Sequence, residues 1–156
     1  MKYYSGTTDF ASDLPSAVTL GKFDGMHRGH QKLFQKVCSQ EGMNRTAFII
    51  APEDVPCLLT KGEKQEKLLH WGFDTAIDCP YVPQILSMTP EDFIEKILVE
   101  RLKVRYITVG SDFRFGCGRK GDAVLLCRLQ EKYGYRIDVI DKERYKEREI
   151  SSTFVR

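Results

Sequence analysis

The sequence predicts one α/β domain, with a parallel sheet of about five strands and helices on both faces. Two observations predict this class. Short β-branched apolar runs alternate with amphipathic segments along the chain. The 156 residues, 42% of them hydrophobic, suffice for a single core. Parallel sheets of this kind bind ligands beyond the carboxyl ends of their strands. We therefore expect the functional residues in the loops that follow the strands.

Each predicted strand is a short apolar run that ends at a glycine, a proline or a polar turn. The strands are expected at residues 16–21, 46–51, 74–80, 105–110 and 135–140. The third is the weakest of the five. Residues 1–14 are expected to form an N-terminal strand and loop leading into the sheet, and the polar segment 144–150 predicts at most a short edge strand.

Two amphipathic segments in the first half of the chain predict helices. In residues 30–42, the apolar residues recur at helical spacing (Leu33, Phe34, Val37), and Gly42 is expected to end the helix. In residues 63–72, Gly72 is expected to end the helix, and its inner face is expected to comprise Leu68, Leu69 and Trp71.

Two further helices are predicted in the second half. Residues 89–102 have the clearest signal, with Thr89 as N-cap and Pro90 in the first turn. Their apolar stripe comprises Phe93, Ile94, Ile97, Leu98 and Leu102. Residues 122–134 follow, with Asp122 as the expected cap.

Composition excludes several classes of protein. The formal net charge of +2 is too small to indicate nucleic-acid or membrane binding. No N-terminal apolar stretch follows basic residues, so we expect no signal peptide, and no apolar run approaches the about 20 residues that span a bilayer. The five cysteines are scattered and form no CxxC pair, which favours reduced thiols in a cytoplasmic protein over a disulfide framework or a zinc site.

The segment KFDGMHRGH, residues 22–30, contains two of the three histidines. It joins a predicted buried strand to a predicted helix, whose free N–H groups and dipole suit an anion. Gly21, Gly25 and Gly29 let the chain turn and a ligand approach. His27 and His30 can then point to one side as donors to phosphate oxygens. A metal site is disfavoured, because zinc-binding helices place their histidines four apart with an adjacent Glu. A packing role for one histidine stays open.

Two more loops after strands have phosphate-binding character. Residues 110–122 (GSDFRFGCGRKGD) combine glycines with Arg114, Arg119 and Lys120, and contain two phenylalanines able to stack on a planar ring. A solvated loop with buried phenylalanines is the alternative. Residues 150–156 (ISSTFVR) offer Ser and Thr hydroxyls with Arg156 one turn further on. The alternative there is a plain helix cap.

These three motifs together resemble the FAD synthetase module of bacterial bifunctional riboflavin kinase/FAD synthetases. HRGH matches the HxGH signature of the nucleotidylyltransferase superfamily, and TLGKFDGMHRGHQKL resembles the module's first motif. DFRFGCGRKGD and ISSTFVR are similar to its second and third motifs, and MTPEDFIEKILVERLKV, which precedes DFRFG in the chain, is similar to a helix of the module. The resemblance covers nearly the whole chain and implies a Rossmann-like sheet.

The resemblance implies transfer of AMP from ATP to FMN, which gives FAD and pyrophosphate with Mg²⁺ bridging ATP oxygens. His27, His30 and Arg156 are the expected catalytic residues. The residues expected to bind ATP are Gly21, Phe23, Asp24, Gly25, Gly29, Ser151, Ser152, Thr153, Arg119 and Lys120. The residues expected to bind flavin are Asp112, Phe113, Arg114 and Phe115. No metal ligand is expected from the protein.

Two departures from the family pattern stand out. The family usually has a Pro-His-Pro turn after the second strand, whereas this chain has APEDVP, with Glu53 and Asp54 and no histidine. The sequence also stops at Arg156 without the family's riboflavin kinase domain. We therefore expect one adenylyltransferase domain, residues 1–156. It is either a stand-alone enzyme to which a separate riboflavin kinase supplies FMN, or a shortened piece of a longer protein, which the incomplete final helix favours. Two alternatives stay open: a nucleotidylyltransferase for another phosphate acceptor, and a non-catalytic nucleotide- or flavin-binding module.

Overall fold

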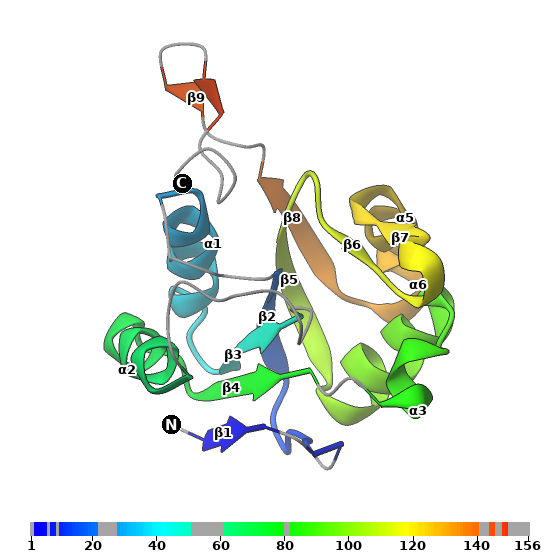
Figure 1. Cartoon of the computed structure of the whole chain (residues 1–156), viewed down its shortest axis with the longest axis horizontal. Helices are drawn as coiled ribbons and strands as arrows, with labels where there is room; N and C mark the ends of the chain where they lie inside the picture. The colour runs from blue at the N-terminus through cyan, green and yellow to red at the C-terminus, as the bar shows by residue number, and fades with distance from the viewer. Residues whose placement is uncertain are drawn as a thin grey trace.

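A computed structural model of the chain describes residues 2–5, 7–8, 10–21, 28–50, 61–79, 82–140, 144–145 and 148–149. Its centre is a parallel sheet of six strands in the order β1-β4-β3-β2-β5-β8 (Figure 1). The strands are β1 (Lys2–Tyr4), β2 (Ser16–Gly21), β3 (Asn44–Ile49), β4 (Thr75–Asp78), β5 (Val104–Gly110) and β8 (Arg136–Ile140). The predicted α/β class with a parallel sheet is confirmed.

The sixth strand, β1, is a short edge strand that pairs with β4, Tyr3 lying opposite Ala76. It corresponds to the strand expected within residues 1–14. Three residues without strong periodicity do not indicate a place in the sheet, which explains the predicted count of about five strands.

The two faces of the sheet carry separate apolar clusters, because side chains alternate along each strand. One face packs against α1 (Arg28–Cys38) and α2 (Lys61–Trp71), with Ala17, Ala47 and Tyr106 on the sheet side. The other face packs against η1 (Phe93–Arg101) and α5 (Ala123–Arg128), with Val18, Phe48 and Ile107 on the sheet side. Figure 1 shows α1 and α2 on one side of the sheet and α3, α5 and α6 on the other. The predicted helices on both faces are confirmed.

Two details of the first two predicted helices were wrong. The helix α1 ends at Cys38 rather than at Gly42, although Gly42 has a φ of +78° in the turn that follows. In α2, Leu68 is fully buried while its neighbour Leu69 is 55% exposed. Successive residues on a helix point about 100° apart, so only one of this pair faces the sheet. Gly72, with a φ of +100°, follows the end of α2 as expected.

The predicted helix over residues 89–102 is confirmed in extent but not in its winding. Thr89 caps α4 (Pro90–Asp92) by accepting the Asp92 N–H, and η1 continues with i→i+5 turns. All five residues of the predicted apolar stripe are buried. Their spacing of four to five residues between successive turns fits the wider i→i+5 winding.

The remaining elements complete the η1 side of the sheet. They are α3 (Pro83–Leu86) before α4, the strands β6 (Arg114–Phe115) and β7 (Gly121–Asp122), the turn η2 (Cys117–Arg119) between them, and α6 (Gln130–Tyr133) after α5. Asp122 caps α5 as predicted, by accepting the Leu125 N–H at 2.9 Å. Beyond β8, β9 (Arg144–Tyr145) and β10 (Arg148–Glu149) pair antiparallel. In the part of the chain that the structure describes, no helix has the length and apolar character to cross a membrane.

Candidate active site

The order of the strands indicates a ligand-binding crevice at the carboxyl ends of β2 and β5. From β2 the chain moves outward through β3 to β4, and β5 then adds on the opposite side of β2. The direction of winding therefore reverses between β2 and β5, and ligands of open α/β sheets bind at such a reversal. The strands end at Gly21 and Gly110, one residue beyond the pairing of Leu20 with Val109. Two of the three predicted motifs thus begin side by side.

The helix α1 begins at this same edge of the sheet, at Arg28. Its first turn contains Gly29 and His30 and has free backbone N–H groups, as the start of any helix does. Leu33, Phe34 and Val37 fix the helix on the sheet, because all three are buried between α1 and the strands. The fold therefore supports the predicted anion-binding position, with the N-terminal end of α1 next to the crevice.

Several predicted residues lie outside the described part of the chain. They are Phe23, Asp24, Gly25, His27, Ser151, Ser152, Thr153 and Arg156. The segment APEDVP, with Glu53 and Asp54, also lies outside it, and at residues 28–30 the structure describes only the backbone. What the structure adds is the position of the two strands, β2 and β8, that lead to these motifs.

The loop after β5 is a small hairpin rather than an open glycine-rich loop. Arg114 pairs with Asp122 and Phe115 with Gly121 across β6 and β7. An ion pair joins the Arg114 guanidinium to the Asp122 carboxylate at 3.4 Å. The predicted flavin contact Arg114 thus already has a partner, and the same carboxylate group caps α5.

The hairpin is seated on Pro90, at the start of the helix that lies under the η1 face of the sheet. A Cβ added at Gly116 would come within 2.8 Å of the Pro90 ring, and one added at Gly121 within 2.8 Å of both Pro90 and Phe115. The Cys117 N–H donates to the Met88 carbonyl at 2.8 Å. These two glycines are therefore required for the close packing of the hairpin on Pro90. The sequence had instead indicated phosphate binding as the role of the glycines in this loop.

Phe113 and Phe115 have different environments. Phe115 is 3% exposed and lies in the core, where its ring contacts Phe93. Phe113 is half-buried and stacks on Phe115, with ring centroids 5.6 Å apart and planes 13° from parallel. Phe113 is therefore the ring nearer to solvent, while Phe115 supports it from below.

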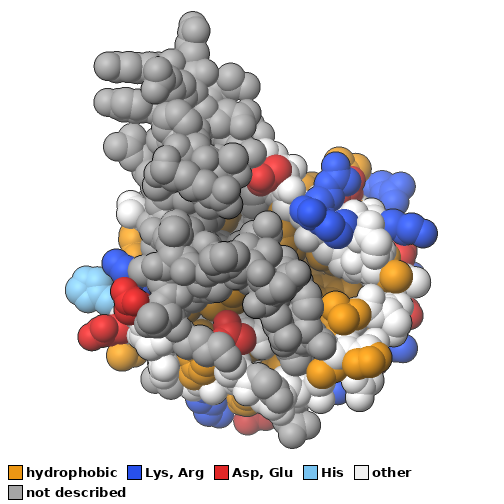
Figure 2. Space-filling model, viewed as in Figure 1, with side chains coloured by type: hydrophobic (Ala, Val, Ile, Leu, Met, Phe, Trp, Pro, Cys, Tyr) orange, Lys and Arg blue, Asp and Glu red, His pale blue; other side chains and the backbone are white. Residues whose placement is uncertain are grey.

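Half-buried apolar side chains from four segments pack, like Phe113, against the apolar cluster on the η1 face of the sheet. They are Ile50 after β3, Cys79 after β4, Val82 and Met88 on either side of α3, and Phe113 itself. We call these five residues the apolar rim. Burial raises the pKa of the Cys79 thiol to about 12, so it is neutral at physiological pH. Hydrophobic side chains are visible on this face of the molecule in Figure 2.

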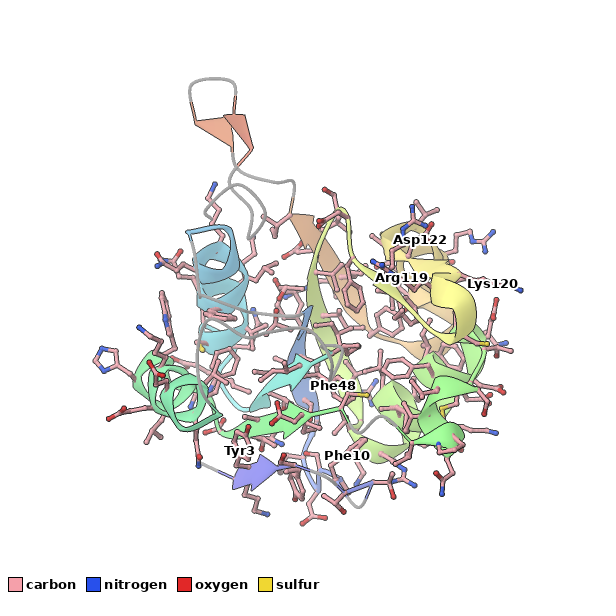
Figure 3. All side chains as sticks on the ribbon, in the orientation of Figure 1. Tyr3, Phe10, Phe48, Arg119, Lys120 and Asp122 are labelled. Carbon is pink, nitrogen blue, oxygen red and sulfur yellow. The ribbon has the colours of Figure 1, made fainter. Side chains whose placement is uncertain are left out.

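Arg119 and Lys120 lie on the exposed side of the hairpin, near α5 (Figure 3). Lysine and arginine side chains gather in this region of the surface in Figure 2. Because the hairpin packs on Pro90, both residues belong to the η1 side of the sheet, whereas α1 covers the opposite face. The structure does not bring these two cations to the N-terminal end of α1.

A polar cluster that the sequence reading missed joins α1 to the β5–β8 edge. The Tyr106 hydroxyl donates to the Asp138 carboxylate, and the Lys36 ammonium lies 3.6 Å from the same carboxylate. The guanidinium of Arg136 lies over the Tyr106 ring, 5.0 Å from its centroid. The Tyr106 hydrogen bond, followed by Lys36 and Arg136, holds the pKa of Asp138 below its ordinary value despite partial burial.

A parallel sheet whose reversal point meets two glycine-ended strands and a helix start is characteristic of nucleotide-binding α/β domains. Comparison with known proteins identifies which of these it is. The model of a family described as FAD synthetase matches residues 9–154. The chain belongs to the FAD synthetase family.

Individual relatives agree with the family. The bifunctional riboflavin kinase/FMN adenylyltransferase of Escherichia coli K12 is 34% identical, over 89% of this chain and 48% of that protein. The FAD synthetase of Listeria monocytogenes is 30% identical, over 90% of this chain and 62% of that protein. The chain thus spans about half the length of the first of these relatives.

A solved structure supports the fold alone. A Streptococcus pneumoniae protein described as a macrolide-efflux protein superposes with a TM-score of 0.78 at 22% identity. The match covers 99% of this chain and 55% of that one. The arrangement of the described elements therefore recurs in a larger protein.

Proposed function

We propose that this chain transfers AMP from ATP to FMN, giving FAD and pyrophosphate. The carrying observation is the reversal of winding where β2 and β5 end at Gly21 and Gly110, with α1 on one face of the sheet and the apolar rim on the other. A nucleotide needs an anion site, and a flavin needs an apolar surface for a planar ring. Membership of the FAD synthetase family supports this pairing of substrates.

In the proposed reaction, a phosphate oxygen of FMN attacks the α-phosphorus of ATP in line. The new P–O bond forms as the bond to the β-phosphate breaks, and pyrophosphate leaves with that electron pair. The nucleophile is already an anion, so positioning and charge stabilisation are the main requirements. His27 and His30 are proposed as donors to the phosphates. Ser152, Thr153 and Arg156 are proposed to hold the departing pyrophosphate.

The flavin ring is proposed to lie on the apolar rim, against the outer face of Phe113. The inner face of Phe113 is covered by Phe115, so a planar ligand would extend an existing stack. Arg119 and Lys120, on the η1 side of the sheet, are better placed to meet this half of the site than the phosphates at α1. We therefore propose them for flavin-side contacts rather than for the triphosphate.

Mg²⁺ is proposed to accompany ATP and to be held mainly by phosphate oxygens and water. Among the described residues, no group of three His, Cys, Asp or Glu side chains could hold a metal ion. Mg²⁺ often retains several waters and binds through nucleotide phosphates, so a site made of phosphate oxygens and water suits this ion. FMN would be supplied by a riboflavin kinase activity, on whichever chain that activity resides.

Pyrophosphate release in the presence of ATP, Mg²⁺ and FMN tests the proposal. Release that requires FMN and yields FAD in equal amount is the expected result. Riboflavin, which lacks the attacking phosphate, is the matched control acceptor and should give none.

Two outcomes would replace the proposal. Release with nicotinamide mononucleotide or phosphopantetheine but not with FMN would indicate a nucleotidylyltransferase for another acceptor. Binding of FMN and ATP without any release would indicate a non-catalytic module.

A further inference from the structure

The tight turn that follows β5 directs two neighbouring side chains, those of Asp112 and Phe113, to different places. The Phe113 N–H donates to the Gly110 carbonyl at 3.1 Å and closes the turn. Phe113 packs against the apolar cluster on the η1 face and stacks on Phe115. The Asp112 carboxylate instead folds back over Gly110, because a Cβ added to this glycine would lie 3.1 Å from the Asp112 Oδ1. The direction in which that Cβ would point therefore tells on which face of the sheet the carboxylate lies.

A Cβ at Gly110 would point toward α1. Side chains alternate along a strand, and Thr108, two residues earlier on β5, donates to the Leu33 carbonyl of α1 at 3.4 Å. Ile140, which is opposite Gly110 on β8, packs against the apolar cluster between the sheet and α1. The Asp112 carboxylate therefore lies on the α1 face, whereas the next residue in the chain lies on the η1 face.

The carboxylate is also level with the first turn of α1. Gly110 is two residues beyond Thr108, which is about 6.6 Å further toward the carboxyl edge of the sheet. The helix runs in the opposite direction, so about four residues back from Leu33 cover the same distance and reach the start of α1 at Arg28. This start is where the ATP phosphates are proposed to bind. Asp112 is exposed, so a bound ligand can reach it.

A carboxylate beside a triphosphate is unfavourable unless a cation stands between them, because like charges repel. Mg²⁺ meets this requirement, since it binds nucleotide phosphates together with one or two carboxylates and keeps several waters.

We propose that Asp112 is a positioning residue that holds the Mg²⁺ complex of ATP at the start of α1, by accepting hydrogen bonds from waters bound to the ion. This assigns Asp112 to the phosphate half of the site, whereas the family resemblance implies a flavin contact. The single turn from Gly110 to Phe113 then serves both halves, with Asp112 on one face of the sheet and Phe113 on the other. The inference rests on the proposed function, because it assigns a role within that site.

Asp112→Asn is the test, because asparagine keeps the shape and removes the negative charge. Binding of ATP is measured without FMN, as the rise in melting temperature that ATP causes during a titration with Mg²⁺. The variant should need about 10-fold more Mg²⁺ for half of the full rise, the scale for loss of a group behind the ligands of a metal. In EDTA the variant should bind ATP more tightly than the unmodified protein, because the repulsion has been removed. A purely structural role of Asp112 does not predict these opposite effects.

Three further variants control the test. Glu131→Gln removes an exposed carboxylate on α6 and should leave the Mg²⁺ titration and binding in EDTA unchanged. Asp112→Glu keeps the charge and should keep most of the Mg²⁺ dependence. Gly110→Ala should raise the Mg²⁺ requirement by a smaller factor than Asp112→Asn, because its Cβ displaces the carboxylate without changing the charge.

An unchanged Mg²⁺ requirement in Asp112→Asn overturns the inference, as does weaker binding of ATP by this variant in EDTA. A higher KM for FMN with an unchanged Mg²⁺ titration would return Asp112 to the flavin half of the site. Absence of FAD formation by the unmodified protein would instead refute the proposed acceptor, and the titration without FMN would still decide the role of Asp112. Absence of any rise with ATP in the unmodified protein would overturn both proposals.

Discussion

Thr89 and Asp122 are single residues whose roles follow from local sequence. Each precedes an apolar periodic segment, and each accepts a backbone N–H in the first turn of a helix. Local patterns of this kind are readable because cap and helix are adjacent in the chain. The Tyr106–Asp138 hydrogen bond depends on neighbouring strands. No sequence spacing indicates it, and the reading missed it.

His30→Ala is expected to lower the turnover of FAD formation by about 100-fold, the scale for loss of one donor to a transition state. The measurement is steady-state pyrophosphate release under saturating ATP and FMN. His70→Ala is the matched control, because His70 is exposed on α2, away from the crevice, and should leave turnover unchanged. Near-normal turnover in His30→Ala would contradict the assigned role.

Asp138→Asn is expected to lower the melting temperature at neutral pH and to have little effect in acid. The pKa of Asp138 is lowered in the folded protein, so the folded state binds its proton less readily than the unfolded state. The stabilisation is therefore complete above the ordinary aspartate pKa of about 3.9 and is lost as pH falls through the lower, folded value. Melting curves at several pH values measure it.

Tyr106→Phe tests the same point from the other partner. Donation by the Tyr106 hydroxyl is the largest cause of the lowered Asp138 pKa. Removing it should raise the pH at which the Asp138 contribution disappears. If the melting temperature of Asp138→Asn is lower by the same amount at every pH, the charge of Asp138 does not contribute to the stability of the folded protein.

At the scale of elements, the strands and main helices follow from periodicity, while the hairpin of β6 and β7 does not. Each of its strands has only two residues, too few for any alternation to be seen. Its glycines resemble those of a phosphate-binding loop in sequence. Their close approach to Pro90 involves a residue that is distant in the sequence, so only the structure shows it.

Gly116→Ala is expected to destabilise the protein by about 1–3 kcal/mol and to raise the KM for FMN. The new Cβ would lie 2.8 Å from the Pro90 ring and 2.9 Å from the Pro90 nitrogen, so the hairpin and Phe113 must move. The KM for ATP should be unaffected, because ATP is proposed to bind at α1. Thermal unfolding and initial rates measure these effects.

Gly118→Ala is the matched control for Gly116→Ala. Gly118 also has a positive φ, +66°, but its nearest contact for a new Cβ is 3.7 Å from the Lys120 side chain. Gly116 (φ +81°, ψ 176°) lies in a region nearly restricted to glycine, whereas the left-handed backbone of Gly118 (φ +66°, ψ 15°) costs alanine less. The comparison therefore covers the backbone strain and the clash with Pro90 together. Equal effects of the two variants would show that the seat on Pro90 does not position the flavin half of the site.

At the scale of the whole molecule, the two proposed halves of the site lie on opposite faces of one sheet. Saturating ligand stabilises a protein by mass action, by about 2.7 kcal/mol at 100 times its Kd. Gly116→Ala should therefore lose much of the rise in melting temperature caused by FMN while keeping the rise caused by ATP with Mg²⁺. A loss of both rises would indicate that the hairpin serves the whole crevice.

The parallel sheet also has a consequence for how the protein folds. Neighbouring strands of the six-stranded sheet are parallel, so no two of them can pair through a tight turn. The strand β2 pairs with β5, where Leu20 lies opposite Val109, and this pairing can form only after the intervening chain has been crossed. Chains dominated by such distant pairings fold slowly. The site between β2 and β5 can form only after this pairing, so the proposed substrates, ATP and FMN, are expected to stabilise the folded protein without speeding the early steps of its folding.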